Sequence, residues 1–275
     1  MKYLILGGKG MAGHLITSYL KEKGYIVYHT SRNLYDQKSL YLDATCIDQV
    51  EHVIHQVKPD VVVNCIGLLN ENAQDHPIEA IQLNSLLPKV IENTVNTYGA
   101  KLVHISTDCV FSGAKGDYLE NDDPDGNSVY SKTKMIGEVC NAPHLTFRTS
   151  IIGPELKNGI GLFHWFMKQK GTIKGFTKVP WNGVTTLEIA KAIEEAVKQN
   201  LSGLYHLTAP TKISKYDLLM LIKTTFNKED VTIEPYDQTE IDRTLLNSRN
   251  DFSYSVSAYP HMIQELKEWI QQHEK

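Results

Sequence analysis

Apolar residues in the first half of the chain follow two alternating patterns. Short continuous runs predict strands of a parallel sheet that is buried on both faces. These runs are residues 2–7, 25–30, 60–67 and 101–107. Between them, apolar residues recur every three or four positions, which predicts helices. The helical segments are residues 11–24, 44–59 and 76–99, the last with an irregularity expected at Pro88. The alternation predicts an α/β fold with a doubly wound, Rossmann-type parallel sheet.

The pattern changes after the apolar segment at 145–154. Residues 155–183 are rich in glycine, lysine and aromatic residues, and the periodicity beyond them predicts one strand and three helices. The strand is residues 203–208, and the helices are 185–200, 214–226 and about 259–273. We therefore expect an NAD(P)-binding Rossmann domain built from 1–150 plus about 178–208. A smaller C-terminal α/β substrate lobe is expected from about 151–177 plus 209–275.

Composition narrows the class of protein. The chain has 275 residues and a net charge of -4, with both signs of charge interspersed. No basic stripe for nucleic acid, signal peptide or membrane-spanning run is visible. The four cysteines form no CxxC pair, and the histidines show no metal-ligand spacing. We expect a cytoplasmic protein with reduced thiols, without a metal, and with neither nucleic acid nor membrane as a partner.

The sequence GGKGMAG follows the first predicted strand and opens the first predicted helix. Glycines at this spacing allow a tight turn and close approach of the backbone to a pyrophosphate at a helix N-terminus. The second strand ends in Ser31 and Arg32, with no acidic residue to bind a ribose 2′-hydroxyl. A hydroxyl and a guanidinium suit a 2′-phosphate, which favours NADPH and leaves NADH possible. Asp43, after the third strand, is expected at the adenine edge.

Tyr130 and Lys134 lie one helical turn apart in VYSKTKMIGE, residues 129–138. Such a pair is common on amphipathic helices, where both side chains cover the core. The chemical alternative is that the ammonium lowers the pKa of the phenol and prepares it for proton transfer. The pair alone does not decide between these interpretations.

Five motifs in order carry a resemblance to a known family. They are the GxxGxxG loop, ISTDCVFSG at 105–113, YLENDDP at 118–124, Tyr130 with Lys134, and RTSIIGP at 148–154. The chain resembles the extended short-chain dehydrogenase/reductases, and within them the dTDP-4-dehydrorhamnose reductase family. The resemblance implies that Tyr130 is the general acid and that Thr107 hydrogen-bonds the substrate carbonyl. It also implies that Lys134 orients the nicotinamide ribose and lowers the pKa of the tyrosine.

The expected site therefore has three parts. The catalytic residues are Thr107, Tyr130 and Lys134. The expected cofactor contacts are Gly7, Gly10, Met11, Gly13, Ser31, Arg32, Asp43, Ala44, Cys65, Ile66, Gly67, Asn84, Tyr130 and Lys134. The expected substrate contacts are Thr107, Asp108, Val110, Phe111, Tyr130, Ser150, Trp181 and Arg243. Two of these have structural alternatives: Phe111 as plain core, and Trp181 as packing within the smaller lobe.

The resemblance implies NADPH-dependent reduction of the C4 ketone of a nucleotide-activated 4-keto-6-deoxy sugar for surface polysaccharide. Departures from the family pattern, such as Ile151 where a tryptophan is usual, leave the sugar open between dTDP-4-dehydrorhamnose and a UDP-linked N-acetylhexosamine. One alternative is a non-catalytic relative, the regulatory subunit of methionine adenosyltransferase. Another is a sugar-nucleotide epimerase. A dehydratase is disfavoured because Asp108 is followed by Cys109 and not by a second acid. A homodimer is possible.

Overall fold

A seven-stranded sheet forms the centre of the molecule in a computed structural model that describes residues 1–156 and 159–273. Every neighbouring pair of its strands is parallel. The order is β11-β6-β5-β4-β1-β2-β3, so the chain reverses direction across the sheet between β1 and β4. The strands are β1 (Lys2–Leu6), β2 (Ile26–Ser31), β3 (Leu40–Tyr41), β4 (Val61–Asn64), β5 (Lys101–Ile105), β6 (Leu145–Arg148) and β11 (Gly203–His206). The predicted doubly wound α/β fold is confirmed.

Helices cover both faces of this sheet, as the apolar runs require. Successive side chains of β1 point to opposite faces. Tyr3 and Ile5 join a core under α1 (Met11–Glu22) and α8 (Thr186–Lys198). Leu4 and Leu6 join a second core under α2 (Ile47–Val57) and α5 (Leu87–Asn96). All four side chains are fully buried. Leu4, Ile5 and Leu6 each contribute about 1.5–3 kcal/mol from the hydrophobic effect.

The segment expected as one helix over 76–99 is broken into three pieces. It consists of α4 (Pro77–Ala80), a π-helical turn η1 (Ile81–Leu86), and α5; the short helix α3 (Asn70–Asp75) precedes it. The expected irregularity at Pro88 was misplaced. Pro88 occupies the first turn of α5, where its missing N–H costs little. The irregularity lies instead at 81–86, in a wide turn of the kind often found at functional sites.

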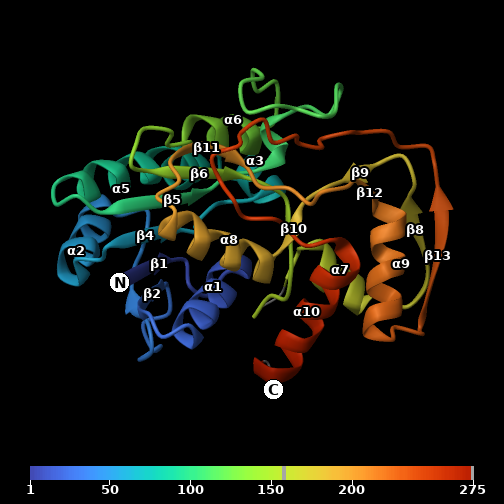
Figure 1. The fold of residues 1–275 in the computed structure, drawn as a ribbon, viewed down its shortest axis with the longest axis horizontal. Coiled ribbons are helices and arrows are strands. Elements are labelled where there is room, and N and C mark those ends of the chain that lie inside the picture. The colour runs from blue at the N-terminus through green and yellow to red at the C-terminus, as the bar shows by residue number, and fades with distance from the viewer. Residues whose placement is uncertain (157–158, 274–275) are drawn as a thin grey trace.

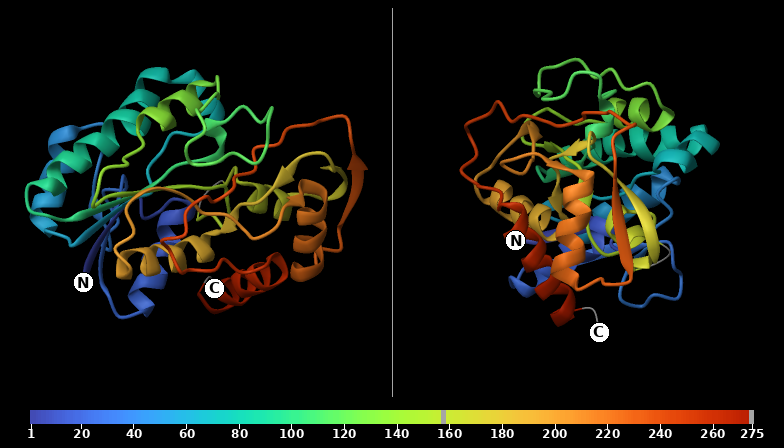
Figure 2. Two further views of the ribbon diagram at one scale, coloured as in Figure 1. Left: turned by 45° about the horizontal axis from the view of Figure 1, so that its top comes forward. Right: turned by 90° about the vertical axis from the view of Figure 1, so that its right-hand side faces the viewer.

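A smaller group of elements lies beside the main sheet, on the right in Figure 1. Here β8 (Gly171–Phe176) pairs with β13 (Val231–Tyr236), and α9 (Lys215–Phe226) packs against both strands. Short pairs join β9 (Pro180–Trp181) to β12 (Ile213–Ser214) and β7 (Ile151–Ile152) to β10 (Val184–Thr185). The remaining helices here are α7 (Leu162–Lys168) and α10 (Tyr259–His273). Figure 2 shows this group from two further sides.

Candidate active site

The glycine loop between β1 and α1 is held by its own backbone and by β2. The Gly10 N–H donates to the Gly7 carbonyl at 2.9 Å, and the Gly7 N–H donates to the Thr30 hydroxyl at 3.1 Å. Gly7 has a φ of +79°, which favours glycine. A Cβ on Gly13 would lie 2.2 Å from the Gly7 carbonyl oxygen, so the first turn of α1 approaches the loop too closely for any side chain.

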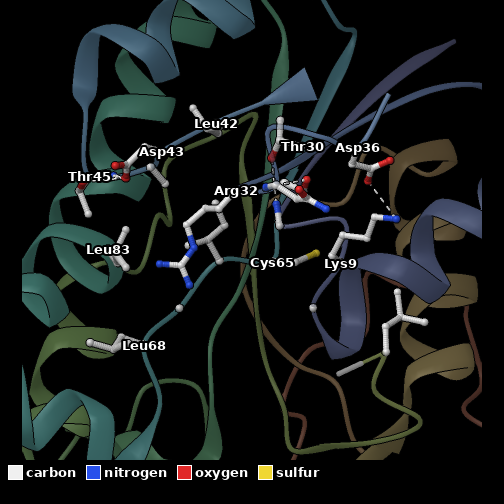
Figure 3. Close-up of a pocket in the computed structure, with 18 of the residues that line it drawn as sticks. Lys9, Thr30, Arg32, Asp36, Leu42, Asp43, Thr45, Cys65, Leu68 and Leu83 are labelled. Atoms are coloured by element: carbon white, nitrogen blue, oxygen red, sulfur yellow. Dashed lines mark hydrogen bonds and ion pairs between the residues drawn. The ribbon is translucent and has the colours of Figure 1, made fainter. Parts of the chain in front are cut away.

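A cavity of about 1060 Å3 opens beside this loop, at the reversal of strand order between β1 and β4 (Figure 3). Doubly wound sheets bind their ligands at this position. Nine of the predicted cofactor contacts line it: Gly7, Gly10, Ser31, Arg32, Asp43, Ala44, Cys65, Ile66 and Gly67. The other five predicted contacts, Met11, Gly13, Asn84, Tyr130 and Lys134, do not.

Lys9 lines the cavity as well and was missed by the sequence analysis. Its Nζ atom lies 3.0 Å from a carboxylate oxygen of Asp36, and this contact lowers the pKa of Asp36 to about 2 (Figure 3). The available signal was its place inside the glycine loop, immediately before Gly10. Lys9, Ser31 and Arg32 together provide two cations and a hydroxyl, a set that fits a 2′-phosphorylated dinucleotide.

The three predicted catalytic residues come from two adjacent elements. Tyr130 and Lys134 lie one turn apart on α6 (Val129–Ile136), which Ser128 caps by accepting from the Ser131 N–H at 3.0 Å. Thr107 follows β5 and caps the short helix η2 (Asp108–Val110). Exposed fractions are 8% for Tyr130, 7% for Thr107 and 4% for Lys134.

Burial dominates the electrostatics of the tyrosine. It raises the pKa of Tyr130, and the charges of Cys109 and Asp108 raise this pKa further, while a side-chain hydrogen bond with Thr107 opposes them. Burial also lowers the pKa of Lys134 to about 8. Lys134 is not among the groups that shift this pKa, so the expectation that it lowers the pKa of Tyr130 stays a prediction. The phenol is held protonated, which is the state that a general acid requires.

Asn84 supports the site from behind and does not face the cavity. It is fully buried on η1, and its side chain binds the Leu68 backbone through both amide atoms. Its Nδ2 also donates to the Thr133 hydroxyl at 3.0 Å. These bonds join the loop after β4 to α6, so we correct the predicted cofactor contact to a structural role.

Three predicted substrate contacts are buried instead. Val110 and Phe111 pack with Leu245 and Tyr118, and the Phe111 ring stacks on Tyr118 with centroids 4.1 Å apart. Trp181 is buried against Tyr259. This burial favours the structural alternatives given for Phe111 and Trp181, and the three substrate contacts stay predictions.

The other predicted substrate contacts, Asp108, Arg243 and Ser150, lie near the catalytic residues. Asp108 is hydrogen-bonded to the Thr107 hydroxyl at 3.1 Å. The positive charges of Lys215 and Arg243 both act on Asp108 and partly oppose the raising of its pKa by burial. The Nε atom of Arg243 donates to the Phe111 carbonyl at 3.0 Å. Ser150 is half-buried beside β7, and its carbonyl accepts from the Val184 N–H.

A glycine loop at the strand reversal, together with Thr107, Tyr130 and Lys134 around β5 and α6, defines an extended short-chain dehydrogenase/reductase fold with a dinucleotide site. The chain belongs to the family described as the RmlD substrate binding domain, whose model matches residues 1–271.

The similar proteins include reductases and a subunit of methionine adenosyltransferase. The dTDP-4-dehydrorhamnose reductase of Salmonella typhimurium is 30% identical over 197 residues, covering 67% of this chain and 66% of the relative. Methionine adenosyltransferase 2 subunit beta of Bos taurus is 24% identical over 253 residues, covering 85% and 75%. The crystal structure of dTDP-4-dehydrorhamnose reductase from Bacillus anthracis, in complex with NADP, has a TM-score of 0.84. It is 20% identical and covers 98% of this chain and 99% of its own, so it shows the shared fold.

Among 1–156 and 159–273, no three or more His, Cys, Asp or Glu side chains are placed to hold a metal ion. No helix within the same ranges is long and apolar enough to cross a membrane.

Proposed function

We propose that this protein reduces the C4 ketone of a nucleotide-activated 4-keto-6-deoxy sugar with NADPH, for surface polysaccharide biosynthesis. The substrate is dTDP-4-dehydrorhamnose or a UDP-linked 4-keto-6-deoxy-N-acetylhexosamine. The observation that carries the proposal is the buried group of Thr107, Tyr130 and Lys134 next to the dinucleotide cavity. Cys65 connects this group to the cavity, because Cys65 lines the cavity and interacts electrostatically with Lys134.

The bound nicotinamide supplies the hydride, and the chain supplies the proton and the polarisation of the ketone. Tyr130, held neutral by burial, donates its proton to the C4 oxygen. The Thr107 hydroxyl donates a hydrogen bond to the same oxygen and stabilises its developing charge. Thr107 now donates to Asp108, so its hydroxyl must turn toward the substrate. Lys134 orients the nicotinamide ribose.

Arg243 and Asp108 are the residues that we assign to the sugar nucleotide. The Nε atom of Arg243 donates to the Phe111 carbonyl. This bond holds the guanidinium where its charge acts on Cys109, next to Asp108. A fixed guanidinium suits a diphosphate, which it can bind in a bidentate manner. Asp108 is half-buried and accepts hydrogen bonds, as expected of a residue that binds sugar hydroxyls.

The test is NADPH oxidation with a panel of dTDP- and UDP-linked 4-keto-6-deoxy sugars. We expect one sugar to drive oxidation and Tyr130→Phe to reduce kcat about 10²–10⁴-fold, because the proton donor is lost. Tyr25→Phe is the matched control. Its hydroxyl binds Glu194 on α8, far from the catalytic residues in the sequence and on another helix, so kcat should stay unchanged.

A protein that binds NADPH tightly and reduces none of these sugars would contradict the proposal. The non-catalytic alternative would then be favoured, since methionine adenosyltransferase 2 subunit beta is a similar protein. Binding of a methionine adenosyltransferase catalytic subunit would be the measurement to make next.

A further inference from the structure

Three polar side chains form a buried row beneath the active site. Asn64 ends β4, His104 lies on β5, and Lys134 lies on α6. Asn64 Nδ2 is 3.2 Å from His104 Nδ1, and His104 Nε2 is 3.2 Å from Lys134 Nζ. Asn64 and His104 are fully buried and Lys134 is 4% exposed, so these atoms must satisfy one another. The proposed reaction assigns no role to Asn64 or His104.

The orientation of Asn64 fixes the tautomer of His104. The Ile66 N–H donates to Asn64 Oδ1 at 3.1 Å, which turns the Asn64 NH₂ group toward the imidazole. An amide NH₂ only donates, so His104 Nδ1 must accept. A neutral imidazole carries a single hydrogen, which therefore lies on Nε2 and points at Lys134.

This arrangement leaves one consistent state for the lysine. An ammonium has donors only and would oppose the His104 Nε2–H. A neutral amine accepts from that N–H and still donates to the Ile105 carbonyl, which lies 2.7 Å from Nζ. A doubly protonated His104 would instead oppose the NH₂ group of Asn64.

We propose that Asn64 and His104 are positioning residues that hold Lys134 as a neutral amine until the active site is used. The consequence for catalysis rests on the proposed reductase function. The ammonium form of Lys134 stabilises the phenolate that remains once Tyr130 has given up its proton, so activity requires Lys134 to gain a proton. His104 must then offer Nε2 as an acceptor, which its present tautomer prevents.

The surroundings are consistent with this assignment. Burial lowers the pKa of Lys134 to about 8, although the charges of Glu138 and Cys65 raise it. Burial, together with the charge of Lys89, holds the pKa of His104 well below its usual range. Within the described residues, the titratable groups whose charges act on this row, besides its own members, are Glu138, Cys65 and Lys89.

The decisive variant is Asn64→Asp. A carboxylate accepts both from the Ile66 N–H and from His104, so the imidazole hydrogen moves to Nδ1 and Nε2 presents a lone pair to an ammonium. We expect the pKa of Lys134 to rise by at least one unit, followed by NMR of ε-¹³C-labelled lysine, with Lys134→Arg assigning the signal. Lys101 is the internal control. Lys101 is also buried, on β5, and burial lowers its pKa to about 8. It donates to the Leu201 carbonyl, so its pKa should not change in the variant.

His104→Gln is the second variant and introduces no buried charge. Its amide can turn its oxygen toward Lys134, so the pKa of Lys134 should again rise. A wild-type pKa of Lys134 near 10.5, or an unchanged pKa in the variants that fold, would overturn the proposal. The titration needs neither NADPH nor sugar, so its failure is separable from failure of the reductase function. Where both hold, the alkaline limb of NADPH oxidation moves upward with the pKa of Lys134.

Discussion

At the scale of single residues, we propose that the charges at the end of β2 and in the glycine loop decide which dinucleotide this protein prefers. Arg32 is exposed at the rim of the cavity, and Lys9 is partly neutralised by Asp36. We therefore assign most of the 2′-phosphate discrimination to Arg32. A hydrogen bond to a charged group contributes about 1.5–3 kcal/mol, and exposure reduces this toward the lower value.

We expect Arg32→Gln to weaken NADPH binding about tenfold and to leave NADH binding unchanged, because NADH lacks the 2′-phosphate. Fluorescence titration with both dinucleotides measures this. Lys38→Gln is the control, since Lys38 lies on the same loop but does not line the cavity. Equal losses of affinity for NADPH and NADH would show that Arg32 stabilises the loop and does not bind the 2′-phosphate.

Residue identity could be predicted from the sequence where backbone geometry leaves few choices. Gly7, Gly10 and Cys65 follow buried strands, so their place at the cavity follows from the direction of the parallel sheet. Asn84 could not be placed, because its role depends on a π-helical turn and on partners 16 and 49 residues away. No local pattern encodes such contacts. The choice between core and pocket for Phe111 was left open for the same reason.

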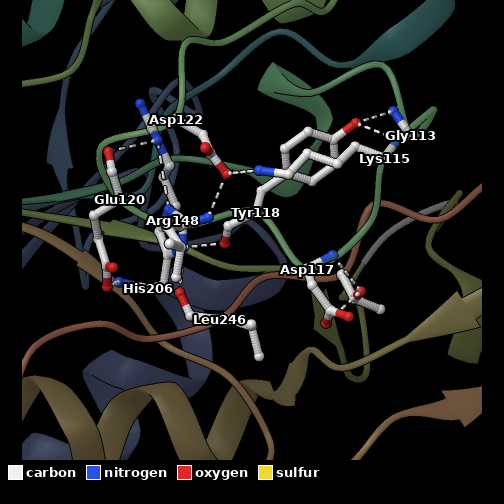
Figure 4. A network of polar contacts seen from close by, with 11 residues as sticks. Gly113, Lys115, Asp117, Tyr118, Glu120, Asp122, Arg148, His206 and Leu246 are labelled. Atoms are coloured by element: carbon white, nitrogen blue, oxygen red, sulfur yellow. Dashed lines mark hydrogen bonds and ion pairs between the residues drawn. The ribbon is translucent and has the colours of Figure 1, made fainter.

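At the scale of elements, a buried ion pair connects β6 to the end of α6. Arg148 donates from Nε and Nη2 to the two carboxylate oxygens of Glu138, each at 2.7 Å, and both side chains are less than a tenth exposed. Arg148 also faces His206 on β11 (Figure 4). The sequence predicted these strands and helices but gave no signal for this contact. An arginine at a strand end is equally typical of a surface.

Replacing one member of this buried pair should lower the free energy of unfolding far more than replacing one member of an exposed pair. We expect Arg148→Met to lower the free energy of unfolding by about 3–5 kcal/mol, because Glu138 remains buried without its partner. Urea denaturation measures it. Adding Glu138→Leu should recover part of the loss. Lys115→Met breaks the exposed Lys115–Asp122 pair of the same region and should cost about 0–1 kcal/mol (Figure 4). Similar costs for both single variants would contradict the argument.

At the scale of the whole molecule, the segment after β13 runs back across the top of the view toward α6 and β11 (Figure 1). The side-chain amide of Asn182 binds the backbone of Leu245 on this segment twice. Asn182 Nδ2 donates to the Leu245 carbonyl at 2.6 Å, and the Leu245 N–H donates to Asn182 Oδ1 at 3.1 Å. Arg243 lies two residues earlier. The predicted division places 178–208 with the dinucleotide core and 209–275 with the substrate lobe, so Asn182 and Leu245 join the two parts.

We expect Asn182→Ala to raise the KM for the sugar nucleotide about tenfold and to leave the Kd for NADPH unchanged within about twofold. Two buried backbone groups of Leu245 lose their partners, each at about 1–3 kcal/mol, and the segment that carries Arg243 shifts. The dinucleotide cavity is lined by residues outside this segment.

Steady-state kinetics and NADPH titration of the same preparations separate the two effects. Asn247→Ala, an exposed position on the same segment, should change neither. If Asn182→Ala weakens both ligands equally, the division into cofactor core and substrate lobe is wrong, because the dinucleotide site then depends on the same contact as the sugar site.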